Sequence, residues 1–406
     1  MAFTKSLSQL SFRSPYFIFL LFYTVYNLVG LVNTGMYYFN DFDTQGPWKL
    51  FLTGLVGYLL GYLFSIFVKR CSRNLLLRKE AYVVVLKPFF PKVILPLSLV
   101  ISLIILTILF IKSKGIPLFL GEKRFSLPPF FFNFYRMFEY LFLFYYVHTR
   151  LYKKNFKKIW LVIFLLFLLL SLGTGYRTQV IEALLFLSLF EFFSYNLPFF
   201  KLLKYSIALI TISSLIALYR VEIDYDALNF FRNINVSFFK EHPYLFPLLP
   251  FFSLMRYSQY TVYQIYHNLG NNYFLGYLAI SNFLTLLPGE QPGMRNIVGE
   301  IIGARIVNGK YMSHTPTLQG AFYIDFGLLG VFFLFFLVGT FISLFDIRKY
   351  IQRKDSFHVY VLMYIYTYTC LSIHVGYWDI IVLVFLLSCF IILCSVQKRK
   401  FIIGVH

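Results

Sequence analysis

Residues 93–111 read VILPLSLVISLIILTILFI, an apolar run without a single charged side chain. A helix that crosses a bilayer needs about 20 predominantly apolar residues, so this stretch predicts a transmembrane helix. Similar runs recur from one end of the chain to the other. Hydrophobic residues make up 59% of the 406 positions and charged residues only 13%, whereas soluble domains carry roughly 25% charged residues. The composition therefore excludes a soluble globular protein.

Apolar length and polar breaks on either side of this run predict ten transmembrane helices and an all-α polytopic membrane protein. The expected spans are 16–37, 50–68, 93–111, 130–147, 159–175, 179–195, 204–219, 318–344, 357–376 and 379–396. The connections 173–178 and 376–379 are so short that they predict tight helical hairpins. The chain accordingly divides into residues 1–219 with the first seven helices, a large loop at 220–317, and residues 318–406 with the last three helices.

The distribution of charge predicts the topology, because Lys and Arg collect on the cytoplasmic side of short loops. The loops at 69–92, 149–158 and 346–355 are strongly basic, and the ten spans put them on the same side as both chain ends. We therefore expect both termini to be cytoplasmic. Since this topology accounts for most of the net charge of +20, no nucleic-acid partner is needed to explain it.

The loop at 220–317 falls on the outer side and is far longer than a turn, yet it is too apolar to be disordered. Segments 244–254, 256–266 and 274–287 have the composition of short helices lying at the membrane interface. Pro250, residues 268–272 and the Pro and Gly residues of 288–293 are expected to separate them. We expect this loop to cap the helix bundle.

Arginines on the outer side break the positive-inside pattern and are the first candidates for a binding site. Arginine suits a bidentate grip on phosphate oxygens, so a cluster of them would suit a lipid-linked diphosphate. Arg177 lies in the turn 173–178, whose glycines would let backbone amides approach an anion at a helix start. A solvated outer loop and a helix-packing turn are the competing interpretations. The candidates are Arg124, Arg177, Arg220, Arg256, Arg295 and Arg305.

Ionisable groups inside the expected spans are costly in a membrane, so each is a functional candidate. Asp325 lies inside the eighth span with no base beside it in sequence, so its partner must come from another segment. Arg136 and Glu139 are spaced i, i+3 and are predicted to neutralise each other. Glu182 lies one turn after Arg177 and is predicted to support that arginine.

His314 directly precedes the eighth span on the outer side. A histidine there can take a proton from a sugar hydroxyl, and a solvated loop histidine is the alternative. No metal motif and no nucleotide-binding loop occurs in the sequence. We therefore expect neither a metal ion nor a cofactor.

Several motifs together resemble the oligosaccharide repeat-unit polymerases, the Wzy-type polymerases of O-antigen and related bacterial surface glycans. They are the turn Gly175, Tyr176, Arg177 after a leucine-rich helix, the opening Gly115 to Leu118 of the second outer loop, the long outer loop itself, and the run from Thr315 through Tyr323, Asp325, Phe326, Gly327 and Gly330 into a helix. The resemblance covers roughly residues 110–345. The N-terminal and C-terminal spans add only their hydropathy.

The resemblance implies a membrane glycosyltransferase of the GT-C type in the bacterial cytoplasmic membrane. It would transfer the growing glycan from undecaprenyl diphosphate to the incoming lipid-linked repeat unit at the outer face. Arg177 would correspond to the turn arginine of the family, and His314 or Asp325 would serve as the base. The resemblance further implies no cofactor, and it leaves room for a chain-length regulator as a partner.

Three other functions compete with this interpretation. An O-antigen ligase differs in its acceptor rather than its architecture, so the sequence separates it poorly from a polymerase. A flippase for lipid-linked oligosaccharides would be expected to have more spans and related halves. A non-catalytic assembly partner would leave the outer arginines dispensable.

Overall fold

The computed structural model describes residues 13–32, 42–71, 80–119, 134–152, 157–175, 178–194, 197–205, 208, 235–284, 293–304, 306–307, 310–311, 314–377 and 381–402. The chain divides into two compact units. The first unit is formed by Met1–Asn74, Phe231–Asp346 and Tyr368–Asp379, and the second by Leu75–Phe230, Ile347–Thr367 and Ile380–His406.

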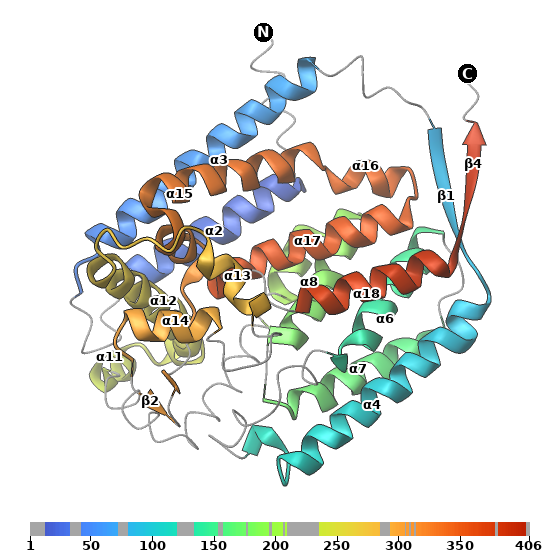
Figure 1. The fold of residues 1–406 in the computed structure, drawn as a ribbon, viewed down its shortest axis with the longest axis horizontal. Helices are drawn as coiled ribbons and strands as arrows, with labels where there is room; N and C mark the ends of the chain where they lie inside the picture. Colours follow the sequence, from blue (N-terminus) through green and yellow to red (C-terminus); the bar gives the residue numbers. More distant parts are fainter. Residues whose placement is uncertain are drawn as a thin grey trace. The chain divides into compact units, whose positions relative to one another are not determined.

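The first unit is built mainly of helices, and Figure 1 labels them along the chain. Its elements are α2 (Pro15–Leu31), α3 (Gln45–Cys71), α11 (Val236–Glu241), α12 (Leu249–Asn268), α13 (Tyr277–Leu284), α14 (Met294–Ile301) and α15 (Thr317–Leu344). A two-stranded ladder joins β2 (Ile306–Val307) to β3 (Lys310–Tyr311). Helix α17 (Ser356–Val375) contributes its end from Tyr368 onward to this unit.

Helices α3 and α15 pack more closely than large side chains would allow, and both run beside α2 (Figure 1). The close approach depends on glycines that are four residues apart. A Cβ at Gly57 would collide with the Phe332 carbonyl, and one at Gly61 with the Phe336 carbonyl. Small residues at this spacing let two helix backbones approach closely, which is how helices associate within a bilayer.

Helix α12 corrects the sequence interpretation of the outer loop. We expected two short helices, at 244–254 and 256–266, with a break at Pro250. The structure instead forms one continuous helix from Leu249 to Asn268. Pro250 occupies its first turn, where a missing N–H costs nothing, so it starts the helix rather than breaking it. The expected break after residue 268 is confirmed, and the third predicted helix is α13.

The second unit also consists chiefly of helices, packed on an aromatic core. Phe142 and Phe164 stack with ring centroids 4.0 Å apart, and Tyr364 stacks on Phe385 at 3.6 Å. Aromatic side chains bury large apolar areas, so these contacts account for much of the packing between the helices. The elements are the π-helix Phe90–Ile94 leading into α4 (Leu95–Lys112), α6 (Met137–Leu151), α7 (Lys158–Leu172), α8 (Thr178–Phe193), α16 (Ile347–Gln352), the start of α17, and α18 (Ile381–Cys394).

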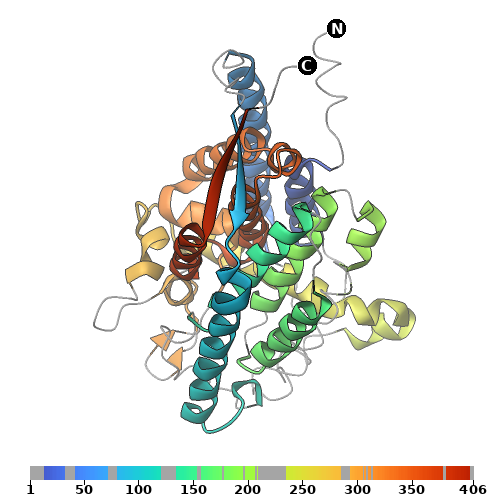
Figure 2. The same ribbon diagram turned by 90° about the vertical axis from the view of Figure 1, so that its right-hand side faces the viewer.

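The second unit also contains a strand pair that the all-α prediction missed. β1 (Glu80–Leu86) pairs antiparallel with β4 (Val396–Ile402), in a register that sets Leu86 opposite Val396. Figures 1 and 2 show the two strands side by side beyond the ends of α4 and α18. The segment from Tyr82 to Val85 has strong β-propensity. Its partner follows more than three hundred residues later, so local patterns could not indicate the pairing.

A described helix overlaps each expected span except 204–219, most of which lies outside the described residues, although the bounds differ by several residues. Among the described residues, three helical stretches are long and apolar enough to cross a membrane by themselves: Gln45–Cys71, Phe90–Phe119 and Thr317–Gln352. Shorter apolar helices are Pro15–Leu31, Lys158–Leu172 and Ile381–Cys394. The chain is a helical membrane protein. The number of spans and the cytoplasmic location of both termini stay predictions.

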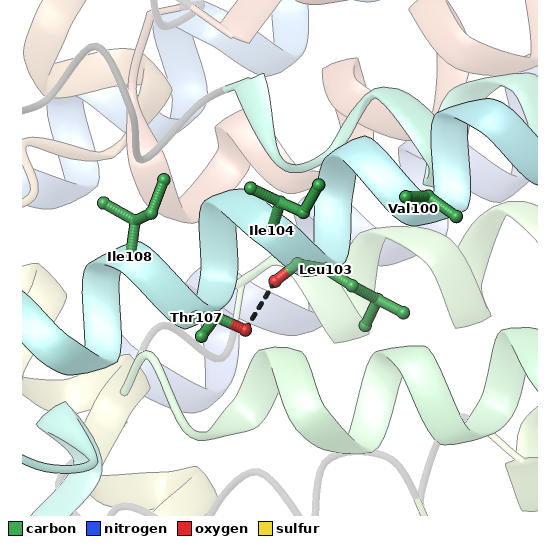
Figure 3. Close-up of a pocket in the computed structure, with 5 residues that line it drawn as sticks. All are labelled: Val100, Leu103, Ile104, Thr107 and Ile108. Atoms are coloured by element: carbon green, nitrogen blue, oxygen red, sulfur yellow. Dashed lines mark hydrogen bonds between the residues drawn. The ribbon is translucent and has the colours of Figure 1, made fainter.

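The exposed face of α4 shows what a lipid-compatible surface looks like in this protein. A shallow hollow there is lined by Val100, Leu103, Ile104, Thr107 and Ile108 (Figure 3). The only hydroxyl in this set, on Thr107, donates to the Leu103 carbonyl at 2.9 Å within the helix. Polar groups facing hydrocarbon must be satisfied internally, and this face meets that condition.

Candidate functional site

His314 precedes α15 in the first unit and is held by two other segments. Its backbone N–H donates to the Arg295 carbonyl of α14 at 3.1 Å. Its Nδ1 lies 2.7 Å from the hydroxyl of Tyr257 on α12. Burial lowers the pKa of His314 below its ordinary value, so the imidazole is neutral at pH 7. Helix α14 therefore holds the backbone of His314, and helix α12 holds its imidazole.

The turn that carries His314 is strained. Thr317, the first residue of α15, has a φ of 60°, which is an outlier for a β-branched residue. Its side-chain oxygen accepts a hydrogen bond from the Gly320 N–H at 3.2 Å. Pro316 packs on Gly376, where a Cβ would lie 2.8 Å from the Pro316 Cγ. Backbone strain of about 1–3 kcal/mol persists only where the surroundings hold it, and such residues cluster at functional sites.

Asp325 has a structural partner rather than a base. As predicted, the partner comes from another segment: Oδ1 accepts from the Leu278 N–H at 3.0 Å and Oδ2 from the Ala279 N–H at 3.2 Å. Both amides belong to the first turn of α13, where a carboxylate satisfies unpaired donors and the helix dipole. The side chain is fully buried. This geometry makes Asp325 the cap of α13, and it leaves His314 as the candidate base.

Helix α15 is broken two residues after Asp325, at Gly327. Gly327 has φ 65° and ψ −159°, a conformation that essentially only glycine adopts. The break leaves the carbonyls of Ile324 and Asp325 without helical partners, and the loop before α13 supplies the donors. The Phe274 N–H donates to the Ile324 carbonyl at 3.0 Å, and the Leu275 N–H donates to the Asp325 carbonyl at 2.9 Å. The segment that carried the family resemblance thus anchors α13 to α15.

Replacing Gly327 by alanine is expected to lower the stability of the protein by about 1–3 kcal/mol, because the backbone conformation excludes a side chain. The added Cβ would also lie 2.8 Å from the Tyr273 ring. The measurement is the thermal unfolding midpoint of the purified protein in detergent.

Gly320→Ala is the matched control for this variant. It lies in the same helix, and its Cβ would make an ordinary contact at 3.4 Å with Ile265. We expect no loss of stability there, because alanine is favoured over glycine inside a helix. Equal midpoints for Gly327→Ala and the wild type would contradict the role given to the break.

Arg256 was predicted to bind a diphosphate, and the structure commits it to the protein backbone. Its Nη1 donates to the carbonyls of Gly30 and Leu31, each at 3.1 Å. The guanidinium lies 4.1 Å from the centre of the Phe42 ring, and the side chain is 7% exposed. The carbonyls belong to the last turn of α2, where a cation is favoured by the helix dipole. Arg256 therefore ties α12 to the end of α2.

The other predicted arginines divide into two groups. Arg295 is partly exposed on α14, and its backbone carbonyl holds His314. Arg295 thus contacts the backbone of His314, whereas Tyr257, the neighbour of Arg256, contacts its imidazole. The remaining four lie outside the described residues, and their roles stay predictions: Arg124, Arg177, Arg220 and Arg305.

A buried ion cluster lies in the second unit between α6 and α8. The predicted pairing of Arg136 with Glu139 is confirmed, with Nη2 2.8 Å from Oε1 and Nε 2.9 Å from Oε2. Glu182 was expected to support Arg177, but its Oε2 accepts from Arg136 Nη2 at 2.9 Å. All three side chains are at most 4% exposed. A buried guanidinium between two carboxylates holds the two helices together.

The sequence interpretation missed a polar network on α12 in the first unit. The Tyr26 hydroxyl on α2 lies 2.7 Å from both the Ser258 hydroxyl and His374 Nδ1. Buried side-chain amides form a second chain through Asn27, Gln259 and Gln319. The polar residues of α12 were visible in the sequence, but their partners are 60 or more positions away. Such networks fix the register of helices that apolar packing alone would leave free to slide.

Within the described residues, no three His, Cys, Asp or Glu side chains gather so that they could hold a metal ion. His314 itself offers an imidazole with a hydroxyl partner on Tyr257.

Comparison with known proteins assigns the family. Residues 11–386 match the family described as "Putative O-antigen polymerase". The chain belongs to the O-antigen polymerase family. It is also similar to an uncharacterized protein of Methanocaldococcus jannaschii, with 24% identity over 308 residues that cover 74% of this chain and 76% of the relative. No solved structure matches the chain.

The match confirms the resemblance that the sequence motifs indicated. It extends well beyond residues 110–345, so the N-terminal spans and most of the C-terminal ones also belong to the O-antigen polymerase pattern. All six predicted arginines, His314 and Asp325 fall inside the matched range.

Proposed function

We propose that this member of the O-antigen polymerase family joins lipid-linked oligosaccharide repeat units into a longer surface glycan. It would act as a multi-pass glycosyltransferase of the GT-C type in the cytoplasmic membrane, on undecaprenyl-diphosphate-linked substrates at its outer face. The observation that carries this proposal is the family match over residues 11–386. The fixed imidazole of His314 supports it, because glycosyl transfer to a sugar hydroxyl benefits from a base.

His314 is the proposed base. In the tautomer that donates from Nδ1 to the Tyr257 oxygen, Nε2 carries the free lone pair. The acceptor hydroxyl loses its proton to Nε2 while its oxygen bonds to the anomeric carbon of the growing glycan. The bond from that carbon to the lipid diphosphate breaks, and the diphosphate leaves with the electron pair. Tyr257 acts as a positioning residue that holds the tautomer.

The arginines are proposed to stabilise the leaving group. A lipid diphosphate gains negative charge as the glycosidic bond breaks, and preorganised cations lower the energy of that state. Arg124, Arg177, Arg220, Arg295 and Arg305 remain candidates for this role. Arg256 is a weaker candidate than the other five, because its guanidinium is occupied by the carbonyls of α2. Asp325 is better suited to positioning α13 than to chemistry.

The experiment that tests the proposal is the length distribution of the surface glycan, separated on a gel, from cells in which the native gene is deleted. If the protein is the polymerase, deletion leaves glycan with a single repeat unit attached to its final acceptor, and the wild-type gene restores the ladder. Membrane levels of the restored protein are measured in parallel.

Two other outcomes have distinct meanings. A ligase transfers finished glycan to its acceptor, so its loss would remove all attached glycan while long lipid-linked chains accumulate inside the membrane. Loss of a flippase would instead trap single units on the cytoplasmic side. An unchanged ladder would contradict all three enzymatic or transport functions. A chain-length regulator would be indicated if the wild-type gene restores polymerisation with an altered length distribution in a different host.

A further inference from the structure

A row of aromatic side chains follows one face of α12, one turn beyond the residue that contacts His314. It consists of Tyr260, Tyr263 and His267, with Phe42 packed beside the first two. The ring centroids of Tyr260 and Tyr263 are 6.2 Å apart, and those of Tyr263 and His267 are 4.5 Å apart. Phe42 lies 5.8 Å from Tyr260 and 5.4 Å from Tyr263. We call these four residues the α12 aromatic row.

The row is accessible and rigidly supported. His267 is exposed, and Tyr260 and Tyr263 are partly exposed. The opposite face of α12 is fully buried at Gln259, Val262 and Ile265 and packs against α2. A ligand on the row would therefore meet side chains that are already in place, which reduces the entropic cost of binding.

The chemistry of the row differs from that of a lipid-facing surface in the same protein. The exposed face of α4 is aliphatic, and its one hydroxyl is satisfied within the helix (Figure 3). The α12 row instead combines ring faces with hydroxyl and imidazole groups, and Gln264 Nε2 donates to the Tyr260 oxygen at 2.9 Å. Acyl chains carry no groups that could form hydrogen bonds with these donors and acceptors.

A sugar matches this combination. A pyranose ring presents C–H bonds on a face that packs on the electron-rich face of an aromatic ring, and hydroxyls around its rim that need hydrogen-bond partners. The row contains no Lys, Arg, Asp or Glu side chain, and the guanidinium that lies on Phe42, that of Arg256, is bound to carbonyls of α2. A polyanion would therefore find no free cation within the row. The row is suited to an oligosaccharide.

The row is continuous with the candidate base. The Tyr257 ring lies 6.5 Å from the Tyr260 ring, and its hydroxyl contacts His314. From Tyr257 to His267 the helix rises about 15 Å, at 1.5 Å per residue. This length accommodates more than one sugar ring, with one end at the imidazole.

We propose that the α12 aromatic row binds the glycan portion of the substrate and delivers its terminal sugar to His314. This inference rests on the proposed function, because the row is assigned to the same reaction. It goes beyond that function by naming the residues that recognise sugars and the helix on which the glycan lies.

The test compares the double variant Tyr260→Leu/Tyr263→Leu with Tyr260→Phe/Tyr263→Phe. Leucine keeps an apolar side chain suited to lipid but removes the ring faces, whereas phenylalanine keeps them. Tyr244→Leu is the matched control, because Tyr244 is an exposed tyrosine that also belongs to the loop at 220–317 but lies outside α12. Each variant is purified in nanodiscs and checked for folding by its elution profile.

Binding is measured by saturation-transfer NMR, with oligosaccharide fragments released by mild hydrolysis from the cells' own surface glycan as the probe. We expect transfer to the sugar protons in the wild type, the phenylalanine variant and Tyr244→Leu, and an approximately tenfold weaker apparent affinity in the leucine variant, which corresponds to about 0.7 kcal/mol for each ring lost. In cells, the leucine variant should give shorter glycans at normal membrane levels.

The outcomes separate this inference from the proposed function. Equal binding and equal ladders for the leucine variant and the wild type would overturn the role of the row, even if deletion of the gene abolishes polymerisation. Conversely, if deletion leaves the ladder intact but fragments bind and the leucine variant loses that binding, the polymerase proposal fails and the row remains a sugar-binding site.

Discussion

Replacing His314 by alanine is expected to stop growth of the glycan beyond a single repeat unit while leaving the protein in the membrane. A positioned base contributes roughly 10²–10⁴-fold to the rate of proton transfer, so the turnover of the purified enzyme should fall by about that factor. The substrate concentration at half-maximal rate should change little, because the imidazole acts in the transition state. The measurement is incorporation of lipid-linked repeat units into longer chains.

Two variants control for the structural part of this effect. His314→Gln keeps a side-chain amide that can hydrogen-bond Tyr257 but has no basic nitrogen, so it should be as inactive as alanine. His242→Ala removes another histidine of the loop at 220–317. The His242 side chain contacts Tyr244 rather than Tyr257, so the activity of this variant should match that of the wild type. An active glutamine variant would remove His314 from the role of base.

The dependence on pH gives a second readout of the same prediction. Burial lowers the pKa of His314, so its neutral form persists below the ordinary histidine pKa of about 6.5. Activity should therefore be retained as the pH falls to about 6.5 and be lost only as the pH falls through the lower pKa of the folded protein. An activity that instead rises toward acidic pH would require the protonated imidazole and contradict a base.

Replacing Arg136 by methionine is expected to destabilise the protein by about 3–5 kcal/mol, because it leaves the carboxylates of Glu139 and Glu182 buried without a counter-ion. The two acids accept hydrogen bonds from one guanidinium that is itself only 4% exposed. The measurement is the folded fraction of the purified protein in detergent as a function of denaturant concentration. Elution of each variant as a single species before the titration shows that it is folded at the start.

The chain supplies a matched control on the same helix. Arg150 also binds a glutamate through two nitrogens, with both distances to Glu191 at 2.9 Å, but its side chain is 43% exposed. Because solvent screens an exposed pair, Arg150→Met should cost no more than about 1 kcal/mol.

A rescue variant identifies the cause of the loss. Adding Glu139→Gln and Glu182→Gln to Arg136→Met removes the uncompensated charges and should recover most of the stability. If the triple variant is as unstable as the single one, packing rather than charge explains the effect.

The sequence predicted contacts within one helix and failed at contacts between helices. The pair Arg136 and Glu139 followed from its i, i+3 spacing. Glu182 was expected to support Arg177, which lies outside the described residues, and nothing in the sequence indicated the contact with Arg136 that the packing of α6 on α8 produces. Sequence spacing carries no information about which faces of two helices meet.

Hydrogen bonds to backbone amides could not be predicted from the sequence either. Asp325 was expected to find its partner on another segment, but that partner is a pair of backbone amides at Leu278 and Ala279. Every residue except proline carries such an amide, so no residue type marks the position. Similarly, the histidine was a candidate from its place before α15, but the contact with Tyr257 depends on how α12 packs.

Pairing of β1 with β4 has a consequence for how the second unit is assembled. Glu80 and Ile402 are opposite each other in the ladder, so the first strand is synthesised long before its partner leaves the ribosome. Until then β1 presents an unpaired edge, the kind of surface on which other chains add. Contacts of such long sequence separation form slowly, since the intervening chain must first be ordered. Closure of this ladder would mark the end of folding, after the helices between the two strands have been inserted.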